Sequence, residues 1–193
     1  MNTSSIINTY VENLASAVTS TDWTPVQALV EMLEEARKQR KQVFLCGNGG
    51  SAANALHMAN DFCAALFKGT RDAIRANALP ANVGVLTCIG NDLSYEQVFS
   101  QQLRVLAEPG DILITLSGSG NSPNILAALH EARSLGVRSV ALLGFDGGKA
   151  LALADHPVHF PIHDMQIVED FQLVIGHMIM RSIAALHGKG CGC

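Results

Sequence analysis

Charged residues are scarce in this sequence of 193 residues. Asp, Glu, Lys and Arg make up 16% of it, whereas hydrophobic residues make up 48%. A disordered chain needs the opposite balance, low hydrophobicity with high charge, so these fractions predict a folded protein. Aromatic residues are also few, at 5%, and we therefore expect a core built from Ala, Leu, Val and Ile.

The sequence also lacks an excess of basic residues. It has 13 Lys and Arg against 17 Asp and Glu, a formal net charge of −4. A dedicated nucleic-acid-binding protein concentrates basic residues on one face, so we expect no nucleic-acid partner. No apolar run approaches the roughly 20 residues that span a bilayer, and residues 1–10 lack the pattern of a secretory signal. We expect a cytoplasmic protein without a membrane partner.

The five cysteines do not form the pattern of a disulfide framework. Their number is odd, and Cys46, Cys63 and Cys88 lie inside apolar segments, where we expect reduced core thiols. Cys191 and Cys193 lie in the glycine-rich tail at residues 188–193, which we expect to be flexible. The role of these two thiols stays open, since the tail could bind a soft metal or form a disulfide.

Hydrophobic periodicity divides the sequence into a helical pair at residues 1–40 and an alternating region at residues 41–187. In the second region, short apolar runs alternate with helical patterns. We expect strands at residues 43–46, 83–89, 111–116, 139–143 and 158–162. We expect helices at residues 51–67, 94–106, 123–135, 149–154 and 166–186.

Strands that are short and almost entirely apolar are typical of a parallel sheet that is covered on both faces. The sequence therefore predicts an α/β protein, a three-layer sandwich with a five-stranded parallel sheet and two extra N-terminal helices. No linker, repeat or low-complexity stretch interrupts it. We expect a single domain over residues 1–193.

Two glycine-rich turns each follow a predicted strand and lead into a helix. They span residues 47–52 (GNGGSA) and residues 117–122 (SGSGNS). Glycines let backbone N–H groups approach an anion, and a helix N-terminus adds partial positive charge. Ser117, Ser119 and Ser122 could surround a phosphate group. Each turn alone could be a simple connection, but two turns at one edge of a sheet favour a binding site.

The first turn also satisfies a relaxed dinucleotide-binding fingerprint. That motif needs an acidic residue about 20 positions later to hold a ribose hydroxyl, and the next predicted strand ends much later, near Asp92. The sequence contains no Walker-type Gly-Lys-Ser/Thr motif either. We therefore expect no nucleotide cofactor, and a phosphate held by hydroxyls and backbone amides.

Residues 47–52, 90–92 (GND) and 119–122 (SGNS) resemble the sugar isomerase domain (SIS) family, and within it the phosphoheptose isomerase branch. The resemblance extends from the N-terminal helices to about Leu186. It implies a flavodoxin-like fold, usually assembled as a homotetramer with active sites between subunits. It also implies an enzyme that interconverts sedoheptulose 7-phosphate and D-glycero-D-manno-heptose 7-phosphate, for the synthesis of activated heptose.

By position, the resemblance assigns the phosphate to the serine-rich turn and the sugar to the first turn. The implied substrate-binding residues are Asn48, Gly49, Gly50, Ser51, Asn91, Asp92, Ser117, Gly118, Ser119, Ser122 and Glu169. The implied ligands of zinc or a similar divalent metal are His57, Asp61, Glu169 and His177.

Aldose–ketose isomerisation moves a proton between neighbouring carbons through a cis-enediol, so it needs one group to take the proton from carbon and another to protonate oxygen. His57 and Asp61 are four residues apart and share a helix face. Glu169 and His177 are eight apart, about two turns. We assign Asp61 as the carbon base and His177 as its partner acid. From spacing alone, an ordinary surface pair at His57 and Asp61 and a buried core histidine at His177 would be the better explanation, and only the match to the family's motif favours a catalytic role.

The sequence departs from the family's pattern at five positions. They are Asp61 (where the family has glutamate), Glu169 (glutamine), Ala65 (arginine), Gln166 (aspartate) and Gly118 (threonine). Lys68 or Arg71 could replace the missing arginine in steering an anionic substrate. These differences concern the choice of sugar and the presence of catalysis rather than the fold.

Two other functions therefore stay open. One is an isomerase of a different phosphosugar. The other is a non-catalytic SIS-domain binding protein, either a partner of a replication initiator or a phosphosugar sensor. A purely structural protein has no need of two imidazoles and two carboxylates together, and their presence favours catalysis.

Overall fold

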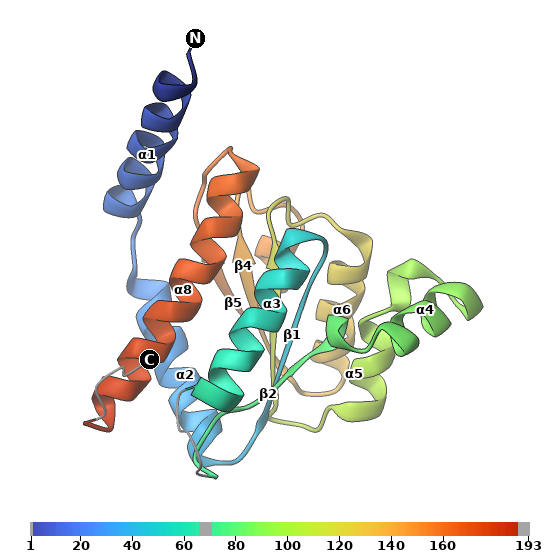
Figure 1. Cartoon of the computed structure of the whole chain (residues 1–193). Coiled ribbons are helices and arrows are strands. Elements are labelled where there is room, and N and C mark those ends of the chain that lie inside the picture. The colour runs from blue at the N-terminus through green and yellow to red at the C-terminus, as the bar shows by residue number, and fades with distance from the viewer. Residues whose placement is uncertain (1, 66–70, 189–193) are drawn as a thin grey trace.

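Five parallel strands form one sheet in the order β2-β1-β3-β4-β5 in this computed structural model, which describes residues 2–65 and 71–188 (Figure 1). The strands are β1 (Gln42–Gly47), β2 (Arg75–Ala78), β3 (Ile112–Ser117), β4 (Arg138–Leu143) and β5 (His156–His159). This is the flavodoxin-like order of doubly wound folds. The predicted α/β sandwich with a five-stranded parallel sheet is confirmed.

Helices cover both faces of this sheet (Figure 1). The α-helices are α1 (Thr3–Ser20), α2 (Thr24–Lys38), α3 (Gly50–Asn60), α4 (Val83–Asp92), α5 (Ser100–Leu106), α6 (Pro123–Ser134), α7 (Ala150–Leu153) and α8 (Met165–Leu186). Successive strand residues point to opposite faces. Val43 and Leu45 accordingly join a core cluster with α2, α3 and α8, whereas Phe44 and Cys46 join a second cluster with α5 and α6.

The core is mainly aliphatic, as expected, but phenylalanine contributes more than its number suggests. Five of the six phenylalanines among the described residues are buried, and they are the largest fully buried side chains there. They are Phe44, Phe62, Phe99, Phe160 and Phe171. Phe171 on α8 contacts Phe160 and Trp23, with ring centroids 5.3 and 5.7 Å apart. These contacts anchor α8 to the sheet.

The strand expected at residues 83–89 is wrong, because those residues form α4. The side chain of Asn82 caps this helix by accepting a hydrogen bond of 3.2 Å from the backbone N–H of Val85. Only Ile89 of this helix is buried, whereas Val85 and Leu86 are half-buried and Val83 is exposed. The second strand is instead β2, four residues at the sheet edge with a single buried position, Ala78. An edge strand needs little burial, and so it has a weak hydrophobic pattern.

Two expected helices are shorter or divided. The helix expected at residues 51–67 ends at Asn60 and continues as a π-helical turn, η1 (Asp61–Ala65). Residues 66 and 67, with Lys68, lie outside the described residues. The helix expected at residues 94–106 divides into a 3₁₀ turn, η3 (Tyr95–Gln97), and α5.

The cysteines differ in their environments. Cys46 is buried, and burial raises the pKa of its thiol. Cys63 and Cys88 are exposed, so the expectation of core thiols is wrong for these two. Cys191, Cys193 and residues 189–193 of the tail, which we expect to be flexible, lie outside the described residues.

Helix α1 extends beyond the sandwich (Figure 1). None of its residues is buried, and Ile6, Ile7 and Val11 are exposed by more than half. The hydroxyl of Tyr10 donates a hydrogen bond of 2.5 Å to Asp170 on α8, which raises the pKa of Tyr10 to about 12. Across the described ranges, no helix has both the length and the apolar character of a membrane span.

Candidate functional site

The two glycine-rich turns meet at the carboxyl edge of the sheet around a pocket of about 270 Å³. Strands β1 and β3 are paired, so the turns that follow them are neighbours. The lining consists of Asn48, Gly49, Gly50, Ser51, Leu116, Ser117, Gly118, Ser119, Ser122, Met165 and Glu169. It includes every predicted substrate-binding residue except Asn91 and Asp92.

Hydrogen bonds inside the serine-rich turn fix the orientation of two hydroxyl groups. Ser117 Oγ accepts a bond of 3.1 Å from the backbone N–H of Gly120, and Ser119 Oγ accepts one of 3.3 Å from that of Asn121. A hydroxyl that accepts one bond still carries its own hydrogen. Ser117 and Ser119 therefore keep a donor for an anion in the pocket.

Gly120 is required by the shape of this turn. Its φ of 62° lies in the left-handed region, which a side chain disfavours. A Cβ atom there would also overlap the carbonyl oxygen of Gly147 in the segment after β4. The carbonyl of Gly120 accepts a bond of 3.0 Å from the N–H of Ala150. The serine-rich turn is thus packed directly against its neighbour.

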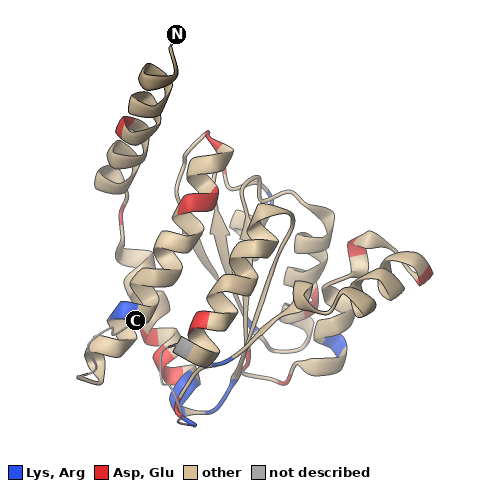
Figure 2. Cartoon of the chain, viewed as in Figure 1, with Lys and Arg blue, Asp and Glu red and all other residues tan. Residues whose placement is uncertain are grey.

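The electrostatics of the pocket are mixed. The N-terminal ends of α3 and α6 both open onto it, since Gly50 and Ser51 begin α3 and Ser122 precedes α6. Helix N-termini carry partial positive charge. Among the described residues that line the pocket, Glu169 alone is charged. Much of the Lys and Arg colour lies at the opposite end of the sheet, around the start of β1 and the segment before β2 (Figure 2).

Glu169 lies against the first turn of α3. A Cβ atom at Gly50 would overlap the Glu169 carboxylate, so the glycine makes room for it. Behind it, Asn54 Nδ2 donates to the backbone carbonyl of Glu169 at 2.9 Å and to Gln172 Oε1 at 3.0 Å. Gln172 Nε2 donates in turn to Ser51 Oγ at 3.0 Å. This buried network joins α3 to α8 beside the pocket.

A second polar network holds the first turn. Asn48 and Asn124 exchange two side-chain hydrogen bonds of 2.9 and 2.8 Å, and the Tyr95 hydroxyl donates to Asn48 Oδ1 at 2.8 Å. Asn124 is buried in the first turn of α6. Asn124 and Tyr95 were not predicted from the sequence, although an amide beside the serine-rich turn is a recognisable signal for Asn124.

Asn91 and Asp92 do not line this pocket. They lie at the exposed end of α4, where Asp92 accepts hydrogen bonds from the Asn91 amide at 2.7 Å and from the Cys88 thiol at 3.4 Å. These bonds, chiefly the one from Asn91, lower the pKa of Asp92. Their assignment to the substrate site came from the family resemblance, and in this structure they lie on α4, outside the pocket.

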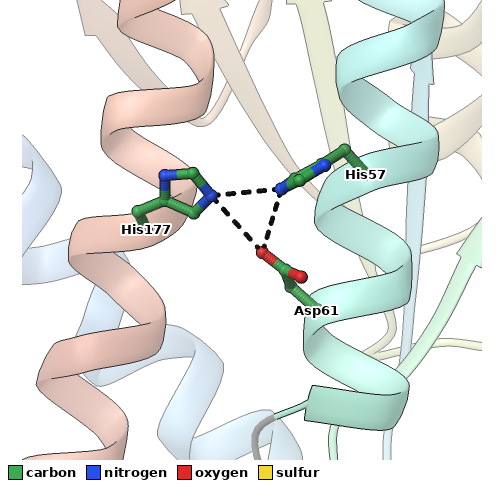
Figure 3. Close-up of side chains that lie close together, drawn as sticks. All are labelled: His57, Asp61 and His177. Atoms are coloured by element: carbon green, nitrogen blue, oxygen red, sulfur yellow. Dashed lines mark hydrogen bonds and ion pairs between the residues drawn. The ribbon is translucent and has the colours of Figure 1, made fainter. Parts of the chain in front are cut away.

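The second feature of the site is a cluster of His57, Asp61 and His177 (Figure 3). The Nε2 atoms of His57 and His177 are 3.1 Å apart. Asp61 Oδ2 lies 3.3 Å from His57 Nε2 and 3.6 Å from His177 Nε2. The Asp61 side chain is 15% exposed, against 47% and 54% for the histidines. The cluster is thus open to solvent on its imidazole side.

The close approach of α3 and α8 brings these groups together. Gly176 precedes His177, and a Cβ atom at this glycine would lie 2.8 Å from Met58 Cγ. Met58 follows His57 on α3. Because position 176 has no side chain, the two helices can approach closely enough for the two imidazoles to meet.

The cluster fits a divalent metal such as zinc. Imidazole nitrogen and carboxylate oxygen bind zinc at about 2.0–2.2 Å, and two ligand atoms of a regular tetrahedron are then about 3.4 Å apart. The three observed separations of 3.1, 3.3 and 3.6 Å bracket that value. Two facing imidazole nitrogens and a carboxylate oxygen therefore present three donor atoms to one point.

The structure brings together three of the four predicted metal ligands. The described group that could hold a metal consists of His57, Asp61 and His177. Glu169 is eight residues before His177 on α8, about 12 Å along the helix axis, and its carboxylate faces Gly50 in the pocket. Its placement agrees with the substrate-binding role that we also assigned to it.

Comparison with known proteins identifies the class. The SIS domain model matches residues 8–144, so this chain belongs to the SIS domain family. Its relatives within that family are phosphoheptose isomerases, as the motifs predict. That of Clostridium acetobutylicum is 42% identical over 154 residues, which cover 80% of this chain and 78% of the relative.

Solved structures give the same result. The phosphoheptose isomerase of Neisseria gonorrhoeae superposes with a TM-score of 0.84 at 28% identity, over 94% of this chain and 96% of that one. The enzyme of Francisella tularensis gives a TM-score of 0.87 at 26% identity, over 95% of this chain and 98% of that one. The predicted SIS fold and its isomerase branch are confirmed.

Proposed function

We propose that this chain is an aldose–ketose isomerase that interconverts sedoheptulose 7-phosphate and D-glycero-D-manno-heptose 7-phosphate. One observation carries the proposal. The serine-rich turn and the N-terminal ends of α3 and α8 line an anion pocket, and the same two helices, with η1, carry a cluster of two imidazoles and a carboxylate. The phosphoheptose isomerase relatives, at 37–42% identity, support this choice of sugar.

The phosphate would bind in the serine-rich turn. The hydroxyls of Ser117 and Ser119, with Ser122 at the N-terminus of α6, supply neutral donors and partial positive charge. The sugar would extend from there past Glu169 toward the cluster. Ser51 and His57 are six residues apart on α3, about 9 Å, so a chain of several carbons is needed to reach it.

The cluster supplies the proton transfers. Asp61 takes the proton from the carbon next to the carbonyl, and the freed electron pair forms the carbon–carbon double bond of a cis-enediol. His177 gives a proton to the carbonyl oxygen in the same step. Asp61 then gives its proton to the former carbonyl carbon, and His177 takes a proton from the hydroxyl of the neighbouring carbon, which becomes the new carbonyl. Protons therefore balance without a redox cofactor.

Zinc suits the donor atoms of His57, Asp61 and His177. When bound, it would polarise the carbonyl oxygen as a Lewis acid in place of the proton from His177, because a coordinated imidazole nitrogen has no proton to give. Glu169 lies in the pocket and serves as a substrate-binding residue, where its carboxylate can accept hydrogen bonds from sugar hydroxyls. It also places a negative charge on the path between the phosphate and the cluster.

We further propose that the protein acts in the cytoplasm as a homotetramer with active sites between subunits. The exposed Ile6, Ile7 and Val11 on α1 support assembly, since apolar side chains are usually covered. The open imidazole side of the cluster also leaves room for a partner subunit.

The experiment that tests the function is turnover of sedoheptulose 7-phosphate followed by NMR in deuterium oxide. We expect heptose 7-phosphate with deuterium at the carbon next to the carbonyl, because the enediol exchanges its proton with solvent. Binding of the substrate without turnover would contradict the isomerase and favour a phosphosugar sensor. Turnover of a shorter ketose phosphate alone would leave the chemistry intact and change the sugar.

A further inference from the structure

The residue at the centre of the serine-rich turn is a glycine, which has no side chain. Gly118 is buried, and a Cβ atom there would lie 2.7 Å from Met165 Sδ and 3.1 Å from Met165 Cε. The nearest Phe145 atom, Cε2, would lie at an ordinary 3.6 Å. Met165 therefore occupies the space that a side chain at position 118 would need.

Met165 is the first residue of α8 and lines the pocket together with Glu169. The two are one helical turn apart and share a face. Met165 is 40% exposed, so part of it is accessible from the pocket that it lines. It lies where the serine-rich turn meets the sugar side of the pocket.

The surrounding backbone fixes this position. Asp164 caps α8 by accepting hydrogen bonds of 3.0 and 3.2 Å from the N–H groups of Gln166 and Ile167. Phe145, beside Gly118, has a positive φ of 44°, and its backbone is held by bonds to Ile162 and to His159 at 3.0 and 2.9 Å. Met165 thus projects from a capped helix end onto a constrained turn.

A thioether beside the anion-binding hydroxyls has a chemical consequence. It donates no hydrogen bond and accepts only weakly. The CH₂ group of a primary phosphate ester can contact it without loss, whereas a phosphate on a branched, hydroxylated carbon would bring bulk and unpaired polar groups against it.

We propose that Met165 determines specificity in this pocket, selecting primary phosphate monoesters, with the phosphate on a terminal CH₂ group, over esters of secondary carbons. The proposal deepens the proposed function, on which it rests, by naming the residue that recognises the atoms next to the phosphate. Gly118 takes part by leaving the space that Met165 fills.

Glycerol 3-phosphate and glycerol 2-phosphate are suitable probes, because they have the same atoms and charge and differ only in the carbon that bears the phosphate. Binding of each is measured by calorimetry. We expect the wild type to bind the primary ester at least about tenfold more tightly, the discrimination that one buried carbon group gives. Met165→Ala should reduce this ratio to about threefold or less. Met165→Leu, of similar volume, should retain it.

A matched control is Met32→Ala, which shortens a half-buried methionine on α2, away from the pocket. It should leave the ratio unchanged. Equal ratios for Met165→Ala and Met32→Ala would overturn the proposal. So would a wild type that binds neither ester or shows no preference between them.

The pairing with position 118 gives a second, reciprocal test. Gly118→Thr should weaken binding of glycerol 3-phosphate about tenfold, because the new side chain and Met165 compete for one space. The double variant Gly118→Thr/Met165→Ala should recover to within about threefold, a non-additivity expected of residues in contact. Strictly additive effects would contradict the shared space. Circular dichroism and the unfolding midpoint show whether each variant is folded.

These outcomes are distinguishable from failure of the proposed function. A selectivity that depends on Met165 without turnover of sedoheptulose 7-phosphate would support the role of Met165 and reject the isomerase. Turnover with no dependence of ester selectivity on Met165 would support the isomerase and reject the role of Met165.

Discussion

The serine-rich pocket and the His57–Asp61–His177 cluster both involve α3 and α8, but they are held in different ways. The turn after β3 forms much of the pocket, and it is held by Gly120 in the left-handed region and by hydrogen bonds from backbone N–H groups to serine hydroxyls of the same turn. Side chains from α3, from the π-helical turn η1 and from α8 form the cluster, which depends on how these elements pack. The binding half of the site is therefore set locally and the catalytic half by tertiary packing.

Binding and chemistry can therefore be damaged separately. A serine side chain removed from the pocket takes away one bond within the turn, but Gly120 and its contact with the segment after β4 remain. A side chain removed from the cluster leaves the helices in place but takes away a donor atom.

Asp61→Asn should separate the two halves most clearly. The amide cannot take a proton from carbon, so we expect kcat to fall by about 10²–10⁴, the usual contribution of a general base. Substrate affinity measured by calorimetry should change by less than about threefold, since the pocket is distant along α3. Asp146→Asn, at a highly exposed carboxylate, serves as control. Equal loss of affinity and kcat would show that the two regions are one unit.

His57→Ala should remove the metal. Loss of an outer partner of a metal site already costs about 10–100-fold in affinity, and loss of a ligand should exceed this. Metal analysis of protein purified without chelator measures the occupancy, with His130→Ala on the exposed face of α6 as control. Absence of metal from the wild type would reject the ligand proposal, while leaving the pocket unaffected.

Ser119→Ala should affect the pocket alone. Loss of a charge-assisted hydrogen bond costs about 1.5–3 kcal/mol, equivalent to about 10–150-fold in phosphosugar affinity. The rate at saturating substrate should stay within a few-fold of the wild type. Ser134→Ala, at the far end of α6, is the matched control. Unchanged affinity would show that the phosphate does not bind at Ser119.

Glu34→Gln should weaken the support that both halves share. Glu34 on α2 binds Arg37 at 2.8 Å and, near the end of α8, His187 at 3.0 Å. The hydrogen bond from Arg37 is the main cause that lowers the Glu34 pKa to about 2 from 4.5. The stabilisation is therefore present above about pH 4.5 and is lost as the pH falls toward 2.

We expect Glu34→Gln to lower the free energy of unfolding at pH 7 by about 1–2 kcal/mol. In urea titrations the difference from wild type should shrink between pH 4.5 and 2, and Glu31→Gln, at an exposed position of α2, should show none. Substrate affinity and kcat should both change little, and by similar factors. A difference that persists at pH 2 would contradict the role of the charge.

The pocket could be predicted from the sequence because its elements are local. The spacing of glycines and serines directly after apolar strands determines both turns, and the lining contains the residues of both. Asn91 and Asp92, which the family resemblance assigned to the substrate site, lie outside this pocket on α4. The strand expected at residues 83–89 was wrong because this apolar run has the composition of a buried strand, whereas Asn82 caps it as a helix. Tyr95 was missed because it follows that helix.

The cluster could be predicted only in part. The spacing of His57 and Asp61 indicates a shared face, but their meeting with His177 depends on how α3 packs against α8. Only the family resemblance pointed to that. Gln172 gave an unused signal, since a neutral polar residue on a strongly apolar helix often has a buried partner. The sequence gives no such signal for Met165, because its contact with Gly118 depends on how α8 packs against the serine-rich turn.

Gly176 couples the packing of two helices to the cluster. Glycine inside a helix is about 0.5–1 kcal/mol less favourable than alanine. At this buried position, however, the methyl group of Gly176→Ala would lie 2.8 Å from Met58 Cγ, and overpacking of this kind costs about 1–3 kcal/mol. The alanine that usually stabilises a helix would therefore destabilise this protein, and the displacement of α8 from α3 would also separate the two imidazoles. The same close contact thus serves both the stability of the fold and the geometry of the site.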